Sequence, residues 1–206
     1  MSPGELTSEQ TRRKFLRSAG FAAAGIAASC RFAAAEPLGF PIGFQGYDAR
    51  FLLMNDWLGG WKQLRDVGFQ SVDLVSFKGY GYEKSNLGKL SGKEVRQTLD
   101  SVGMLAENCQ FYFAELHDTF QEAMTYAHEL GLKYIICAPA SGHRATADDW
   151  KWQAEQFNEL GRRVQAEGFQ VGYHNHDLEF MPVGAVIPYD VLMRTPIRSW
   201  FGSRST

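Results

Sequence analysis

One unit recurs along this chain of 206 residues: a helix that ends at a glycine, followed two or three residues later by an apolar strand. The glycines are Gly68, Gly103, Gly131 and Gly168. Glycine is common just after a helix because it adopts the left-handed conformation that ends one. The strands expected after them span 71–77, 104–113, 132–138 and 169–176, and a first short strand is expected within 39–47. Such alternation predicts an α/β fold with a parallel sheet joined by right-handed crossovers.

The helices between these strands are predicted from apolar spacing and from capping residues. A first helix is expected at 56–67, and a capping box at Ser91–Glu94 begins a second that Gly103 ends. Two more are expected at 115–130 and from the cap at Thr146 to Glu167. The sequence therefore contains about five βα units.

The first 35 residues resemble an export signal. Arg12 and Arg13, followed by Lys-Phe-Leu-Arg, match the twin-arginine pattern, and a weakly apolar Ala/Gly stretch and small residues at 33–35 follow. An amphipathic N-terminal helix is the alternative. Lipidation at Cys30 is not expected, because Ala27 stands where a lipobox has Leu. We therefore expect a protein that is exported to the periplasm or secreted.

The charge balance argues against two classes of partner. The formal net charge is −2, the isoelectric point is about 6.2, and the part after residue 35 is more acidic still. A nucleic-acid-binding protein needs a basic face. Apart from the Ala-rich leader, no apolar run reaches the ~20 residues of a membrane span. We interpret Cys109 and Cys137 as two buried thiols, although an exported protein can form a disulfide.

The C-terminal ends of parallel strands are where such folds place their chemistry. His174 and His176 lie at the end of the fifth expected strand, where alternate residues point to the same side. Two imidazoles placed in this way can contact a metal ion or a sugar hydroxyl, and Asp177 and Glu179 follow them.

Other ionisable residues carry weaker signals. Asp73 stands in the middle of a strand, where a carboxylate must be hydrogen-bonded or face a wet interior. His143 lies in a loop beyond the fourth strand. His117 and His128 are interpreted as surface residues, and the tyrosines at 80, 82 and 112 as core and rim. The sequence has no Gly-x-Ser-x-Gly elbow, no Cys-x-x-Cys pair and no phosphate-binding glycine loop.

Residues 171–180, Val-Gly-Tyr-His-Asn-His-Asp-Leu-Glu-Phe, together with the strand–helix alternation, resemble the sugar phosphate isomerase/epimerase family of xylose isomerase-like TIM barrels. The resemblance covers about 38–193. Val72-Asp73 looks like the family's second strand, and 104–113 like its third, with Gln110 where many members have His. The resemblance thus implies a (β/α)8 barrel, of which this chain has about five βα units.

The resemblance also implies a function and its residues. Family members isomerise or epimerise a sugar by moving a proton next to a carbonyl, with a divalent metal (Mn, Zn or Mg) held by four side chains. Carried over by position, His174 is the first metal ligand and His176 a catalytic contact to substrate or metal. Asp73, Gln110 and His143 are expected to bind the sugar. The other three metal ligands have no counterpart in the sequence.

The length then becomes informative, because a complete barrel takes ~250 residues and rarely fewer than ~200. Residues 194–206 lack periodicity and family character. Permitted codons for them, read two bases later, give a run that resembles the family's sixth strand, which suggests a frameshift truncation. We expect the exposed sheet edges of a partial barrel to make it unstable or aggregating unless it forms a homo-oligomer.

Several alternatives stay open. The chain could be a non-catalytic exported fragment or sugar-binding remnant. A keto-inositol dehydratase and an abasic-site endonuclease use related barrels, and the acidic charge argues against the endonuclease. A complete flavodoxin-like sheet also has five strands, but no phosphate loop follows the first one here.

Overall fold

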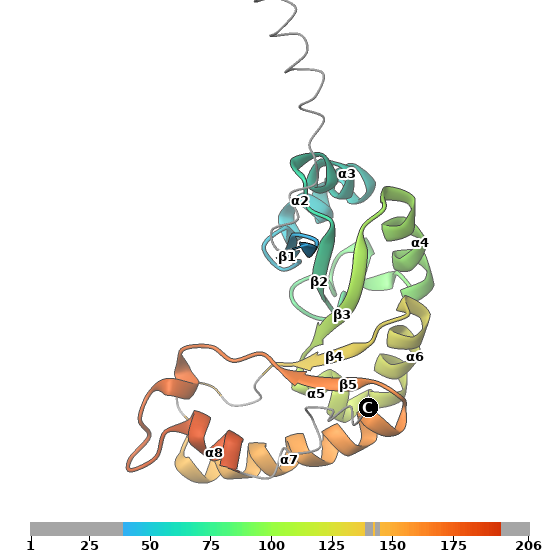
Figure 1. The fold of residues 1–206 in the computed structure, drawn as a ribbon. Coiled ribbons are helices and arrows are strands. Elements are labelled where there is room, and N and C mark those ends of the chain that lie inside the picture. The colour runs from blue at the N-terminus through green and yellow to red at the C-terminus, as the bar shows by residue number, and fades with distance from the viewer. Residues whose placement is uncertain (1–38, 139–141, 143–144, 195–206) are drawn as a thin grey trace, which may run out of the picture.

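The computed structural model describes residues 39–138, 142 and 145–194. Five strands form one parallel sheet in which each strand pairs with the next in the sequence. The strands are β1 (Gly43–Gln45), β2 (Ser71–Val75), β3 (Leu105–Phe111), β4 (Tyr134–Cys137) and β5 (Gln170–Tyr173). Figure 1 shows that the sheet curves as it passes from β1 to β5.

Helices connect the strands and cover the outer, convex side of the curve (Figure 1). They are α2 (Arg50–Asn55), α3 (Trp57–Val67), α4 (Gly92–Val102), α5 (Phe113–Asp118), α6 (Phe120–Leu130), α7 (Ala147–Ala166) and α8 (Pro188–Arg194). Two 3-10 turns, η2 (Asn86–Lys89) and η3 (Leu178–Phe180), lie in the loops after β2 and β5.

The strand order decides between the two expected α/β folds. A flavodoxin-like sheet is wound in both directions from its first strands and carries helices on both faces. Here the order is β1-β2-β3-β4-β5 and the helices lie on one side. Successive right-handed crossovers that always advance in one direction produce this arrangement, which is the winding of a TIM barrel. The prediction of a partial barrel of about five βα units is confirmed.

Three elements differ from the prediction. The helix expected at 115–130 is two helices, because Thr119 leaves the helical conformation (φ −122°, ψ 39°) between α5 and α6. The short helix α2 was not expected, since six residues are too few to show a helical period. β5 ends at Tyr173, so that His174 and His176 follow the strand instead of belonging to it.

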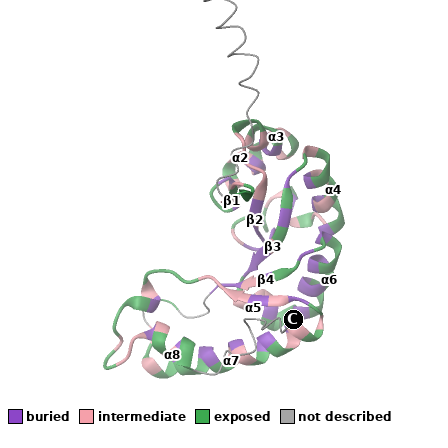
Figure 2. Cartoon of the chain, viewed as in Figure 1, coloured by how far each residue is buried: buried purple, intermediate pink, exposed green. Residues whose placement is uncertain are grey.

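The core lies between the sheet and the helices, and Figure 2 shows buried residues on the inner sides of α4, α6 and α7. Trp61, Trp150 and Leu99 are its fully buried anchors on the helices. Cys109 and Cys137 point into the same core as free thiols. Burial raises the pKa of both thiols well above the usual range, so they stay protonated. The interpretation as two buried thiols is confirmed.

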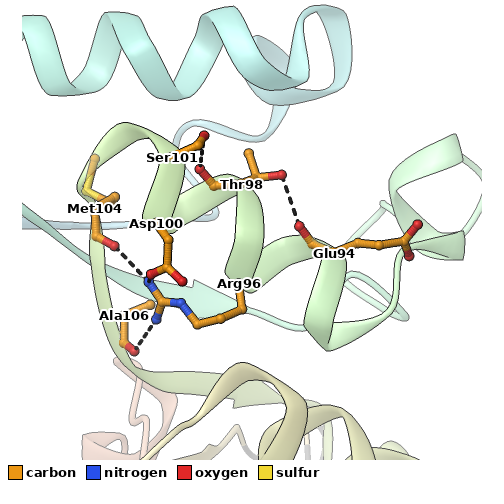
Figure 3. A network of polar contacts seen from close by, with 7 residues as sticks. All are labelled: Glu94, Arg96, Thr98, Asp100, Ser101, Met104 and Ala106. Atoms are coloured by element: carbon orange, nitrogen blue, oxygen red, sulfur yellow. Dashed lines mark hydrogen bonds and ion pairs between the residues drawn. The ribbon is translucent and has the colours of Figure 1, made fainter.

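A polar network joins α4 to the beginning of β3 (Figure 3). The Arg96 guanidinium donates to the carbonyl oxygens of Met104 at 3.1 Å and Ala106 at 3.5 Å. It also forms an ion pair with Asp100, one helical turn further on, at 2.7 Å. One side chain thereby satisfies carbonyls of the chain segment that leads into the sheet, which fixes the helix against the strand.

Several predictions lie outside the described residues: the twin arginines Arg12 and Arg13, the cysteine at 30, the loop residue His143 and the tail after Arg194. Among the residues that the structure describes, no helix is both long and apolar enough to cross a membrane.

Candidate functional site

A row of polar side chains crosses the concave face of the sheet, the face turned away from the helices. Gln45, Asp73 and Asn108 are partners across the first three strands. Gln110 lies two residues beyond Asn108 and therefore on the same face. The carboxylate of Asp73 accepts a hydrogen bond from Asn108 Nδ2 at 2.7 Å and a second from Gln110 Nε2. The carboxylate of Asp73, which would be costly to bury without a partner, is thus hydrogen-bonded, which is one of the two environments that the sequence predicted for it.

Burial shapes the electrostatics of this row. It raises the pKa of Asp73, while the hydrogen bond from Gln110 and the charge of His174 act in the opposite direction. It lowers the pKa of His174, and the neighbouring His176 lowers it further, against the carboxylates of Asp73 and Glu179. His174 is therefore a neutral imidazole near pH 7, able both to donate and to accept a hydrogen bond.

The two histidines lie together although the strand has ended. The backbone N–H of His174 still donates to Cys137 O at 3.0 Å, which extends the β4–β5 pairing by one bond. The rings of His174 and His176 are 4.7 Å apart between centroids. Their adjacency, predicted from strand alternation, is therefore produced by the loop.

Glu179 holds this loop in place. Its side chain is fully buried, and its carboxylate accepts from the backbone N–H of His176 at 2.8 Å and from the Tyr173 hydroxyl at 2.6 Å. Both oxygens are thus used to connect the end of β5 to the loop that carries the histidines. The sequence placed Glu179 near the site, but its role as an anchor depends on a return of the chain through η3 that periodicity does not reveal.

A cavity of about 270 Å³ opens at the C-terminal ends of the strands. The polar side chains that line it are those of Gln45, Gln110, His174 and His176. Its remaining walls are Ala138 and the three tyrosines at 47, 80 and 112. Of the predicted site residues, the structure therefore brings Gln110 and both histidines together around one space.

Asp73 does not line this cavity, but its carboxylate is hydrogen-bonded to Gln110, which does. It lines instead a hollow of about 440 Å³ at the other end of the concave face, together with Asn108 and Glu107. Its carboxylate accepts a hydrogen bond from the amide of Gln110 and so positions it, while the assignment of Asp73 to sugar binding stays a prediction. Asn108 was not singled out in the sequence, although its period-2 relation to Gln110 and its position opposite Asp73 are the signals that would have found it.

The tyrosines at 80, 82 and 112 were interpreted as core and rim, and the structure places Tyr80 and Tyr112 on the cavity wall together with Tyr47. Tyr80 and Tyr112 stack face to face, with ring centroids 3.9 Å apart and planes at 8°. Tyr47 meets the edge of Tyr80 at 6.1 Å. These rings come from the loops after β1, β2 and β3, the strand ends at which chemistry was expected. Tyr82 is fully buried in the core, as expected.

The described residues do not make a complete metal site. No three side chains among His, Cys, Asp and Glu in these ranges come close enough to hold one ion. The carboxylates of Asp73 and Glu179, whose charges act on His174, already accept hydrogen bonds from protein groups. His174 and His176 alone offer two nitrogen donors, short of the three or four side chains that hold a catalytic metal. The assignment of His174 as a metal ligand stays a prediction.

Comparison with known proteins supports the fold. No family model and no curated protein matches the sequence. A solved structure does: the crystal structure of a sugar phosphate isomerase/epimerase from Parabacteroides distasonis, with a TM-score of 0.61 and 20% sequence identity. The match covers 75% of this chain and 60% of that one, so the chain spans less than two thirds of the length of the protein it resembles. At this level of identity the likeness shows a shared fold.

Proposed function

We propose that this chain binds a small sugar or sugar derivative in the cavity at the C-terminal ends of the strands, and isomerises or epimerises it by moving a proton next to a carbonyl. The observation that carries the proposal is the pair of adjacent imidazoles in a cavity that a hydrogen-bonded amide and tyrosine rings complete. Its location agrees with the rule for TIM barrels, and the structural neighbour's title names a sugar phosphate isomerase/epimerase.

His176 is the residue that we assign to proton transfer. Its side chain is exposed at the cavity, and its backbone is fixed by Glu179 through the 2.8 Å hydrogen bond. An imidazole exchanges protons near neutral pH more readily than other side chains do. The imidazole nitrogen takes the proton from the carbon beside the carbonyl, which leaves an enediol. In an isomerisation this proton is returned to the former carbonyl carbon while the hydroxyl proton passes between the two oxygens, and in an epimerisation a water molecule on the opposite face supplies the proton to the first carbon while the imidazole keeps the one it took.

His174 and Gln110 are assigned to substrate binding. The neutral imidazole of His174 can pair with a sugar hydroxyl as donor or acceptor. The amide of Gln110 is held in one orientation because its Nε2 donates to Asp73. A fixed amide loses little conformational freedom when a ligand binds, which favours affinity.

Hydrogen exchange tests the reaction directly. The purified full chain is incubated in D₂O with D-fructose, D-glucose, D-xylose and 2-keto-myo-inositol, and with their phosphates where these exist, in the presence and absence of Mn²⁺, Zn²⁺ and Mg²⁺. NMR then follows the hydrogen on the carbon next to the carbonyl. We expect deuterium to enter one compound, and His176→Gln to abolish this exchange.

The matched control is His128→Gln, because His128 is an exposed histidine on α6, away from the cavity. It should leave the exchange unchanged. If no compound exchanges in any condition while at least one binds in a His174-dependent manner, the chain is a non-catalytic sugar-binding protein. That second candidate is favoured by one observation, the lack of a third metal ligand among the described residues. If no compound binds at all, the sugar assignment is wrong.

We also propose export by the twin-arginine route, on the strength of Arg12 and Arg13 in the sequence. The test expresses the full chain with a C-terminal tag in a bacterium that has the pathway. Fractionation should find the shortened chain in the periplasm, and replacement of both arginines by lysine should retain it in the cytoplasm. Equal distribution of both forms would contradict the proposal.

A further inference from the structure

Tyr80 has a backbone conformation that its side chain disfavours. Its φ is 57°, and no other non-glycine residue in the described ranges has a positive φ. A bulky residue in this region is rare and strained. Its hydroxyl is also buried without a hydrogen-bond partner among the described residues. Strain of this kind persists where the surrounding structure imposes it, and it concentrates at binding and catalytic sites.

The neighbouring glycines allow this conformation. Gly81 has φ 87°, which continues the left-handed turn. At Gly79 an added Cβ would lie 2.7 Å from the ring of Tyr112 and 3.0 Å from Glu115 Oε2, so a side chain there would push the ring away. The Gly-Tyr-Gly sequence of this loop therefore brings Tyr80 and Tyr112 into their face-to-face contact at 3.9 Å.

Glu115 fixes the two loops relative to each other. Its carboxylate accepts from Ser76 Oγ at 2.5 Å and from the backbone N–H of Tyr112 at 2.9 Å. Ser76 follows β2 and Tyr112 follows β3, so one side chain joins the two strand ends from which the rings arise. Glu115 does not line the cavity and acts through the tyrosines as a positioning residue.

We propose that the stacked rings of Tyr80 and Tyr112 form an aromatic platform whose free ring face packs against the C–H face of a cyclic sugar or cyclitol in the cavity that the two histidines also line. This rests on the proposed function and adds to it the form of the substrate. Both tyrosines line the same cavity as His174 and His176, and Tyr112 is 42% exposed there. A flat ring offers a broad apolar contact at low entropic cost, and a cyclic ligand presents a matching flat face that a flexible open chain does not.

The experiment compares cyclic with open-chain ligands on the purified full chain. The cyclic probes are methyl α-D-glucopyranoside and myo-inositol, which cannot open, and the open-chain probe is D-glucitol. Saturation-transfer NMR with irradiation of the aromatic resonances reports which ligand protons touch aromatic rings, and titration gives the dissociation constants. We expect the cyclic probes to bind about tenfold more tightly than D-glucitol, with the strongest transfer to the C–H protons of one ring face.

Paired variants separate the platform from a role in folding alone. Tyr112→Leu and Tyr80→Leu should weaken binding of the cyclic probe about fivefold to tenfold, which corresponds to the free energy of one aromatic contact. Tyr112→Phe and Tyr80→Phe keep the rings and should bind as the wild type does. Glu115→Ala should weaken binding, whereas Glu115→Gln should keep it, because the amide oxygen can accept from the Tyr112 N–H and the amide nitrogen can donate to Ser76 Oγ. Tyr134→Leu, an exposed tyrosine on β4 outside the cavity, is the matched control.

The outcomes distinguish the two proposals. If cyclic probes bind, lose affinity in His174→Ala and keep it in both leucine variants, the platform is wrong and the sugar site stands. The same conclusion follows if D-glucitol binds as tightly as the cyclic probes. If no probe binds the wild type, the platform and the sugar site are both wrong.

Discussion

Some single residues in this protein lower its stability, and packing alone does not explain why they are there. Glu115 is one of them, because its carboxylate is withdrawn from water beneath the loops that hold Tyr80 and Tyr112. Burial raises its pKa, and the hydrogen bonds from Ser76 and Tyr112 oppose this only in part. The residue therefore keeps its two loops together at the expense of a desolvated charge.

This cost predicts a pH dependence. A carboxyl group whose pKa is raised in the folded state binds more protons there than in the unfolded chain, so its contribution to stability is full below its ordinary pKa of 4.5 and is lost as the pH rises through the folded value. Glu115→Gln carries no charge, and its amide can accept from the Tyr112 N–H and donate to Ser76 Oγ. We expect the free energy of unfolding of the variant, relative to the wild type, to rise between pH 4 and pH 7 in urea titrations. A constant difference over this range would contradict the assignment.

Part of the candidate site was readable from the sequence. The spacing of His174 and His176 and their place after an apolar run located them, because strand ends meet at one edge of a parallel sheet. Asp73 was expected to be hydrogen-bonded or to face a wet interior, because its carboxylate stands in the middle of a strand. The contacts to Asn108 and Gln110 depend on the register between β2 and β3, where the pairing shifts between Ser71 and Asp73. A single sequence does not encode such a shift in any local pattern.

Elements were predicted better than their contacts, since caps and glycines are local signals. The capping box at Ser91 and the left-handed Gly68, Gly103 and Gly131 are all where the sequence placed them. What local signals do not report is how closely two helices approach. Gly92 begins α4 against α6, and an added Cβ there would lie 2.4 Å from the carbonyl oxygen of Tyr126.

We therefore expect Gly92→Ala to destabilise the protein although alanine favours helices. The gain in helix propensity is at most ~1 kcal/mol, whereas overpacking against rigid backbone costs about 1–3 kcal/mol. Urea denaturation should show a lower midpoint with an unchanged slope. Lys93→Ala, at the exposed neighbouring position, is the control and should change the free energy of unfolding by less than ~0.5 kcal/mol. A Gly92→Ala protein as stable as the wild type would show that the two helices are not in close contact.

The network between α4 and β3 gives a second prediction at this scale (Figure 3). Arg96→Met keeps much of the apolar stem but leaves the carbonyls of Met104 and Ala106 without their donors. The loss of hydrogen bonds from a charged group should lower the free energy of unfolding by about 1–3 kcal/mol.

Asp100→Asn is the comparison for this network. It removes only the charge of a partner whose side chain is 64% exposed, and exposed ion pairs contribute little. Both variants are measured by the same denaturation experiment. Equal losses in the two would mean that the ion pair, and not the carbonyl contacts, holds the helix.

For the whole molecule, the decisive feature is a sheet that curves toward closure and whose outer strands, β1 and β5, have no second partner strand among the described residues. In the part of the chain that the structure describes, β1 and β5 each pair with one strand. The concave face between them carries the 440 Å³ hollow, and Leu105 in its wall is 53% exposed. Unpaired backbone groups and exposed apolar side chains on a sheet are both sources of association. The sequence predicted the order of the strands through the likeness to a barrel. It did not predict what covers the concave face.

We expect the purified chain to associate with itself, as a dimer or larger homo-oligomer, because a second copy can pair with a free edge and cover the apolar part of the concave face. Sedimentation velocity over a hundredfold range of concentration should show the average mass rise. Gln170→Lys places a charge on the edge strand β5 and should lower the association, whereas Gln121→Lys, on the exposed surface of α6, should not. A chain that stays monomeric at every concentration and melts in one cooperative transition would show that the five βα units are stable with both edges open.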